Sequence, residues 1–204
     1  MLPYVITILA AYLLGTLNPA LFLSRRRGVD LRAGGSKNLG TANTVILMGW
    51  GMGFLVCLFD VGKAALSVLL SQRVFPGTPY LGLIAGVACI LGHMFPFYLR
   101  FRGGKGFASY VGVMLAVNWR FTLSFAAFAI LMAVLTRVIF AATLVTIVSF
   151  PVFLAVTAFW VDAAIIGFAS LVILCRHKEN FTRILNGTEV RFKQARKGEL
   201  RVKK

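Results

Sequence analysis

The segment that decides the fold class covers residues 2–23 and reads LPYVITILAAYLLGTLNPALFL. It contains no charged side chain, and Arg25-Arg26-Arg27 follow it closely. A helix needs ~20 mostly apolar residues to cross the hydrocarbon core of a bilayer. The segment lacks the basic start and the Ala-x-Ala cleavage site of a signal peptide. We therefore expect a retained membrane-spanning helix.

Six more apolar runs follow along the chain. The run at residues 107–117 cannot cross a core of ~30 Å unaided at ~1.5 Å per residue, so it is either re-entrant or joined to the next run. We expect an all-α fold, a polytopic membrane bundle of about seven transmembrane helices, or five, forming a single domain over residues 1–204. The six runs are Gly53–Ser71, Tyr80–Tyr98, Phe107–Val117, Phe121–Thr136, Val138–Trp160 and Ala163–Cys175.

The overall composition supports the same class. Hydrophobic residues make up 59% of the chain and the mean hydropathy is +0.84, whereas soluble domains contain roughly 45–50% apolar residues. A chain of this size could not hide so much apolar surface from water. The three cysteines lie far apart without a CxxC pair, so neither a disulfide framework nor a metal site is expected.

The basic residues are distributed unequally between the two sides of the predicted bundle. Nineteen of the 22 Lys and Arg fall in loops or the tail on one side, Arg73 and Arg120 fall on the other, and Lys63 lies within a run. An excess of Lys and Arg marks cytoplasmic loops. We therefore expect the N-terminus outside, the C-terminus in the cytoplasm, and the polar loops on the cytoplasmic face. The net charge of +16 is explained by this face, and nucleic acid is not expected as a partner.

The first polar segment, residues 34–44, contains three glycines, three hydroxyls, two amides and a cation. Glycines allow the backbone to approach a ligand, and a helix that begins near Thr41 would direct N–H groups at an anion. The alternative is a solvated loop that only caps a helix. The candidate binding residues here are Ser36, Asn38, Gly40, Thr41 and Asn43.

The second segment runs from Gly92 to Gly106 and contains Gly-Gly-Lys-Gly at residues 103–106 before an apolar helix. It combines a close backbone approach with the point charge of Lys105 and a helix N-terminus, although it lacks the Walker spacing. His93 makes either a structural hydrogen bond or a substrate contact. Candidate binding residues are His93, Gly103, Gly104, Lys105 and Gly106.

The third segment begins at Arg176, where the last apolar run ends. If this run continues as a helix, His177 and Asn180 share one face because they are three residues apart. A titratable ring and an amide would then lie together at the membrane boundary. Glu189 is expected to form a structural salt bridge.

Asp60 and Lys63 lie three residues apart within the second apolar run. Charges at that depth are costly unless they are paired. Mutual neutralisation is the main interpretation, and an ion or proton pathway is the alternative.

Together the three segments resemble the acyl-phosphate-dependent glycerol-3-phosphate acyltransferases of bacterial inner membranes. The family pattern is similar to Ser-Gly-Asn-x-Gly-Ala-Thr-Asn, then Gly-His with Gly-Gly-Lys-Gly-Val-Ala-Thr, then Arg-His-x-x-Asn-Ile with Gly-x-Glu. Here Lys37 replaces a glycine, Thr41-Ala42 inverts Ala-Thr, and Phe181 replaces isoleucine. The matching residues are Ser36, Asn38, Gly40, Asn43, Gly92, His93, Gly103, Gly104, Lys105, Gly106, Ala108, Arg176, His177, Asn180, Gly187 and Glu189.

The resemblance implies transfer of an acyl group from a long-chain acyl phosphate to the 1-hydroxyl of glycerol 3-phosphate. The products would be 1-acylglycerol 3-phosphate and phosphate, in phospholipid biosynthesis. The reaction would need no cofactor and no metal, and a monomer in contact with membrane lipid is expected. Catalytic roles fall on Ser36, Lys105, His177 and Asn180, with His177 acting either as a general base or as a phosphate-binding group.

A permease for a phosphorylated or other anionic solute is the competing interpretation, because it would also need spans, a basic face and glycine loops. Two features count against it. The sequence shows no convincing internal repeat, and its polar residues concentrate at one face and not at the bilayer midplane, where transporter sites lie.

Overall fold

The computed structural model describes residues 1–136 and 139–186, and these form helices and loops with no strand. The predicted all-α fold is therefore confirmed for the described part of the chain. The elements in chain order are α1 (Leu2–Thr16), α2 (Pro19–Arg26), α3 (Thr41–Met48), α4 (Trp50–Val74), α5 (Leu81–Met94), a 3₁₀ turn (Phe97–Leu99), α6 (Phe107–Thr136), α7 (Ile139–Val156), α8 (Trp160–Arg176) and α9 (Lys178–Leu185).

The first apolar run is two consecutive helices and not one. α1 ends at Thr16, and Leu17 has extended backbone angles. Asn18 then starts α2, because its side-chain oxygen accepts a hydrogen bond from the Leu21 amide at 2.8 Å and Pro19 occupies the first helical turn. Asn at an N-cap followed by Pro is a strong helix start. The break leaves carbonyl groups of the α1 C-terminus in need of partners.

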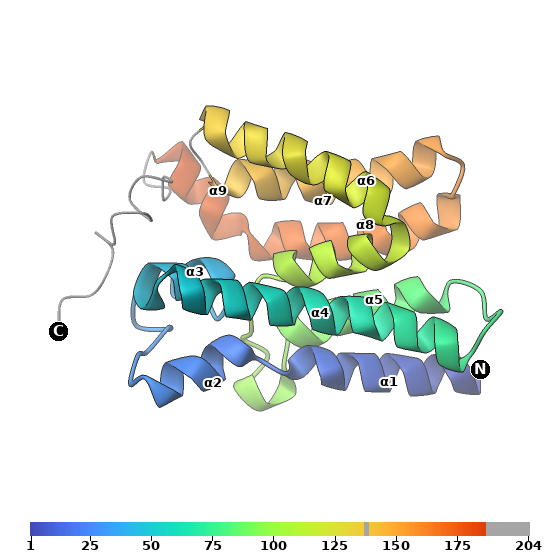
Figure 1. Ribbon diagram of the computed structural model, residues 1–204, viewed down its shortest axis with the longest axis horizontal. Helices are drawn as coiled ribbons and strands as arrows, with labels where there is room; N and C mark the ends of the chain where they lie inside the picture. Colours follow the sequence, from blue (N-terminus) through green and yellow to red (C-terminus); the bar gives the residue numbers. More distant parts are fainter. Residues whose placement is uncertain (137–138, 187–204) are drawn as a thin grey trace.

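The predicted fourth and fifth apolar runs meet inside α6. Asn118 has non-helical backbone angles (φ −151°, ψ 87°), and its side chain accepts a hydrogen bond from the Phe121 amide at 3.0 Å. It therefore acts as the N-cap of a second helical segment. The chain turns back sharply at this point (Figure 1), so Arg120 lies beside the turn and not in the middle of a straight span.

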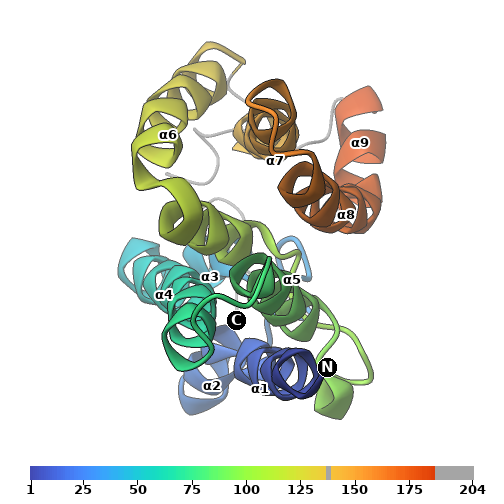
Figure 2. The same cartoon turned by 90° about the vertical axis from the view of Figure 1, so that its right-hand side faces the viewer.

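Within residues 1–136 and 139–186, four helical stretches are long and apolar enough to cross a bilayer, and α8 with α9 would make a fifth across a 51° bend. Helix α5 is the centre of the bundle, since it packs against α1, α4, α6 and α8 (Figure 2). Twelve of its fourteen residues are buried. Large apolar side chains on the outer helices, such as Phe54, Leu135 and Leu171, are exposed instead. This distribution suits a bundle surrounded by lipid.

Glycines allow the central helices to approach closely. A Cβ added at Gly15 would lie 2.1 Å from the Cys89 carbonyl oxygen, and one at Gly92 would lie 2.1 Å from that of Tyr12. The backbones of α1 and α5 therefore touch directly, as small residues permit between membrane helices. This contact sets where α5 ends and where the loop that follows it begins.

The polar segments gather at one end of the bundle. Helices α2, α3 and α9 lie at this end, whereas the N-terminus and the turn between α4 and α5 lie at the other (Figure 1). Loops far apart in the sequence are thus brought to a common place.

Candidate functional site

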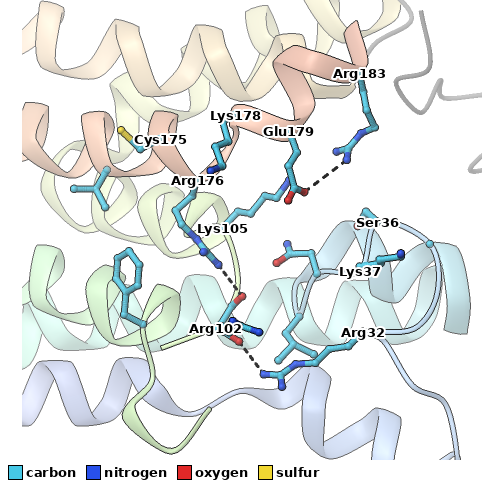
Figure 3. Close-up of a pocket in the computed structure, with 16 residues that line it drawn as sticks. Arg32, Ser36, Lys37, Arg102, Lys105, Cys175, Arg176, Lys178, Glu179 and Arg183 are labelled. Carbon is cyan, nitrogen blue, oxygen red and sulfur yellow. Dashed lines mark hydrogen bonds and ion pairs between the residues drawn. The ribbon is translucent and has the colours of Figure 1, made fainter. Parts of the chain in front are cut away.

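The polar end of the bundle contains an open cavity of about 950 Å³. Among the described residues, seven basic ones and a single acidic one, Glu179, line it together with apolar side chains (Figure 3). All three predicted polar segments contribute to it. The lining residues are Arg32, Gly35, Ser36, Lys37, Asn38, Leu39, Phe95, Arg102, Gly103, Lys105, Val172, Cys175, Arg176, Lys178, Glu179 and Arg183.

The first segment reaches the cavity through Ser36 and Asn38, and Asn43 holds the loop in place. Asn43 is fully buried. Its side-chain oxygen accepts from the Ser36 amide at 2.7 Å, and its side-chain nitrogen donates to the Leu31 carbonyl at 2.7 Å. A Cβ at Gly35 would lie 2.2 Å from the Asn43 side-chain oxygen, and the φ of Gly35 is +57°. Glycine is therefore required at this turn.

The remaining candidates of the first segment do not line the cavity. Gly40 precedes α3 in an extended conformation, and Thr41 is the first residue of that helix. The Leu39 carbonyl accepts a hydrogen bond from the Asn18 side chain at 3.2 Å, which ties the loop to the start of α2. Gly40, Thr41 and Asn43 thus support the loop, while Ser36 and Asn38 face the cavity.

The Gly-Gly-Lys-Gly loop folds back onto the end of α5. The Gly103 amide donates to the Met94 carbonyl at 3.0 Å, and the Gly104 amide donates to the His93 carbonyl at 3.1 Å. These two N–H groups are therefore used inside the protein. Gly103 and Gly104, which the sequence offered as binding residues, therefore do not offer these two amides to a phosphate. The φ of Gly106 is +88°, which favours glycine at the start of α6.

What the loop presents to the cavity is Lys105. Its ammonium group donates a hydrogen bond to the side-chain oxygen of Asn180 in α9. Arg176 crosses between the same two segments, and its guanidinium lies 3.3 Å and 3.4 Å from the Gly103 and Gly104 carbonyl oxygens. The second and third predicted segments are thus joined through side chains.

His93 lies in a buried charged cluster and not in the cavity lining. Asp60 and Lys63 form an ion pair at 2.8 Å, and Nδ1 of His93 lies 3.3 Å from the same Asp60 oxygen. A Cβ at Gly104 would lie 2.1 Å from Nε2 of the His93 ring. The ring therefore packs directly against the glycine loop and holds the loop in position.

The last predicted segment does not continue as one straight helix. The axes of α8 and α9 differ by 51°, and His177 is the residue between them. His177 is 5% exposed, its Nδ1 lies 2.8 Å from the Ile173 carbonyl oxygen, and its ring stacks on Phe140 of α7 at 5.0 Å. Asn180 instead meets Lys105, so the two residues do not lie on one straight helical face.

Several cavity residues were not among the sequence candidates. Arg32 donates to the Arg102 carbonyl at 2.9 Å, and Glu179 lies 3.8 Å from Arg183. The sequence predicted a face rich in Lys and Arg, which includes these residues, but it did not indicate which of the side chains point into the cavity. In the described ranges, no three His, Cys, Asp or Glu lie together as metal ligands would. Glu189 lies outside the described residues.

This arrangement is suited to binding phosphate groups, since cations from several elements face a single space. Apolar side chains from α5 and α8, including Phe95 and Val172, line the same cavity. A ligand with a charged head and an apolar chain would therefore meet matching surfaces.

Two relatives illustrate the similarity of this chain to known proteins. A glycerol-3-phosphate acyltransferase from Brucella anthropi is 34% identical over 179 residues, which cover 87% of this chain and 88% of that protein. A protein of the same name from Syntrophotalea carbinolica is 36% identical over 205 residues, which cover 95% of this chain and all of that protein.

Two crystal structures of PlsY (YgiH), an integral membrane glycerol 3-phosphate acyltransferase, share the fold. The glycerol 3-phosphate form superposes with a TM-score of 0.89 at 30% identity, covering 95% of this chain and 97% of that one. The lysophosphatidic acid form gives 0.84 at 30% identity, with 93% and 95% covered. The sequence also matches the glycerol-3-phosphate acyltransferase family over residues 5–187. This chain therefore belongs to the glycerol-3-phosphate acyltransferase family.

Proposed function

We propose that this protein transfers an acyl group from a long-chain acyl phosphate to the 1-hydroxyl of glycerol 3-phosphate. The products are 1-acylglycerol 3-phosphate and inorganic phosphate, and the reaction belongs to phospholipid biosynthesis. The observation that carries the proposal is the cavity lined by seven basic residues beside apolar helices. Family membership supports the acceptor, and the resemblance of the three polar segments to acyl-phosphate-dependent enzymes supports the donor.

An acyl phosphate is a mixed anhydride, so its carbonyl carbon is already activated. The hydroxyl oxygen of glycerol 3-phosphate attacks that carbon, the bond to the phosphate oxygen breaks, and phosphate leaves with the electron pair. The hydroxyl proton passes either to His177 or to a phosphate oxygen of the substrates. No covalent enzyme intermediate and no cofactor are needed. The protein has to hold two anionic groups together and to stabilise the departing phosphate. Fixed cations aimed at developing charge often provide the greater part of an enzyme's rate enhancement.

Lys105 is the residue to which we assign this stabilisation. It lies on the cavity wall, and its hydrogen bond with Asn180 fixes the ammonium group between the loop and α9. Ser36 and Asn38 offer neutral hydrogen-bond groups from the opposite loop. Alignment of the hydroxyl and the anhydride in this space adds a further rate effect.

The donor is tested with the purified protein in detergent. With palmitoyl phosphate and glycerol 3-phosphate, we expect lysophosphatidate and phosphate in equal amounts, measured by mass spectrometry and phosphate release. Palmitoyl-CoA should give no product. Comparable turnover with the thioester would refute the donor assignment, and no product from either donor would refute the acyltransferase proposal and leave a permease to be tested.

The role of Lys105 predicts a specific loss. Lys105→Ala should lower kcat/KM at least tenfold, or ~1.4 kcal/mol, and Asn180→Ala should lower it as well. Because the two side chains bond to each other, their double mutant should lose less than the product of the single losses. Arg73→Ala, at the other end of the bundle, is the control and should match the wild type. If the loss of kcat/KM in the double mutant equalled the product of the two single losses, the contact between Lys105 and Asn180 would not serve catalysis.

To His177 we assign two roles: it places α9 against the cavity, and a ring nitrogen serves the reaction either as a general base or as a phosphate-binding group. His177→Phe separates the second role from packing, because phenylalanine keeps a ring against Phe140 and removes both nitrogens. We expect kcat to fall at least tenfold while the melting temperature stays near that of the wild type. Full activity in this variant would show that the ring contributes only packing.

We further propose a bacterial inner-membrane location with the cavity facing the cytoplasm. The support is the concentration of basic residues at the cavity end. In a variant without native cysteines, a cysteine at Ala33 should react with a membrane-impermeant maleimide only after the cells are opened. A cysteine at Arg73 should react in intact cells. The reverse pattern would invert the proposed orientation.

A further inference from the structure

Lys37 has a backbone conformation that a side chain makes unfavourable. Its φ is +55°, in the left-handed region, where residues other than glycine are uncommon because Cβ crowds the backbone. The family motif that this chain resembles has glycine at the same position. A lysine here therefore costs stability that a glycine would not, and such costs tend to persist at functional sites.

The surrounding loop imposes this conformation whatever the side chain. The Lys37 amide donates to the Gly34 carbonyl at 3.0 Å, and the preceding amide, that of Ser36, is held by buried Asn43 at 2.7 Å. Gly35 also has a positive φ and packs against Asn43. These contacts fix the turn up to Lys37, and after it the Leu39 carbonyl is held by the Asn18 side chain at 3.2 Å. The residue therefore cannot relax into a common conformation without breaking these bonds.

The side chain of Lys37 lines the cavity. Figure 3 shows it beside Ser36 on the α2–α3 loop, across the cavity from Arg176. Arg32, Lys105, Arg176 and Arg183 are each engaged with a carbonyl, an amide or a carboxylate. In the described part of the chain, the charged groups of Lys37, Arg102 and Lys178 form no hydrogen bond or ion pair. Lys37 is the one of these three cations that lies on the α2–α3 loop.

We propose that Lys37 binds the phosphate of glycerol 3-phosphate and so sets the affinity for the acceptor; this inference rests on the proposed function. Phe95 and Val172 line the α5–α8 side of the cavity, where an acyl chain has an apolar path to lipid. The donor phosphate is therefore held near Lys105. The small polar acceptor occupies the loop side, where Lys37 donates to its phosphate oxygens as a point charge.

Three variants separate charge from backbone strain. Lys37→Gly removes both the charge and the strain, Lys37→Asn removes the charge but tolerates the left-handed region, and Lys37→Arg keeps the charge. KM is measured for each substrate with the other saturating, together with the melting temperature in detergent. Arg27→Met, an exposed cation outside the cavity, is the control.

We expect Lys37→Gly to raise the KM for glycerol 3-phosphate about tenfold and to leave the KM for palmitoyl phosphate unchanged. Its melting temperature should rise by a few degrees because the strain is relieved. Lys37→Asn should show the same KM change, whereas Lys37→Arg and Arg27→Met should stay within about twofold of the wild type.

An unchanged KM for glycerol 3-phosphate in Lys37→Gly would refute the inference while the wild type still made lysophosphatidate. A rise confined to the KM for palmitoyl phosphate would also refute it, since the contact would then belong to the donor. A wild type that makes no product would refute the proposed function and this inference together.

Discussion

The interaction on which the rest of the structure depends is the buried ion pair between Asp60 and Lys63. Both side chains are 2% exposed, and charges so far from water are costly unless every hydrogen-bonding group finds a partner. Lys63 satisfies this condition, because its ammonium group also donates to the Gly15 and Leu17 carbonyls at 3.0 Å and 2.7 Å. These are the carbonyls left unpaired by the break between α1 and α2. The pair thus stabilises the break that sends α2 toward the cavity loop.

His93 connects this ion pair to the loop that borders the cavity. Its Nδ1 lies close to both Asp60 and Lys63, its carbonyl accepts from the Gly104 amide, and its ring fills the space beside Gly104. Three helices, α1, α4 and α5, therefore meet at one charged cluster directly beneath the loop that carries Lys105. His93, for which the sequence left open a structural hydrogen bond or a substrate contact, lies here as a positioning residue. These polar contacts fix the loop that carries Lys105 before any substrate arrives, as the catalytic role proposed for Lys105 requires.

Sequence patterns located the helices well where the signal was simple. Apolar run length placed the membrane segments, and the weakness of the run at residues 107–117 corresponds to the turn at Asn118. The break at Asn18-Pro19 was visible as a capping residue before proline, but the long apolar run around it concealed the signal. The partners of His93 and of the Gly103 and Gly104 amides could not be predicted, because they depend on how α4 and α5 meet in space. The bend at His177 likewise reflects packing on Phe140 of α7 and not local propensity.

The concentration of basic residues around the cavity has its own physical consequence. Like charges facing one space repel each other, and Glu179, the single carboxylate among the described lining residues, offsets little of that repulsion at the exposed rim. The repulsion is reduced where guanidinium groups bond to backbone carbonyls, as Arg32 and Arg176 do. These bonds also fix the positions of the charges. An anion entering the cavity therefore relieves repulsion between cations that are already oriented, and two phosphates relieve it more than one. The charge distribution thus favours simultaneous occupation by two phosphate groups, which is the state that the proposed direct acyl transfer requires.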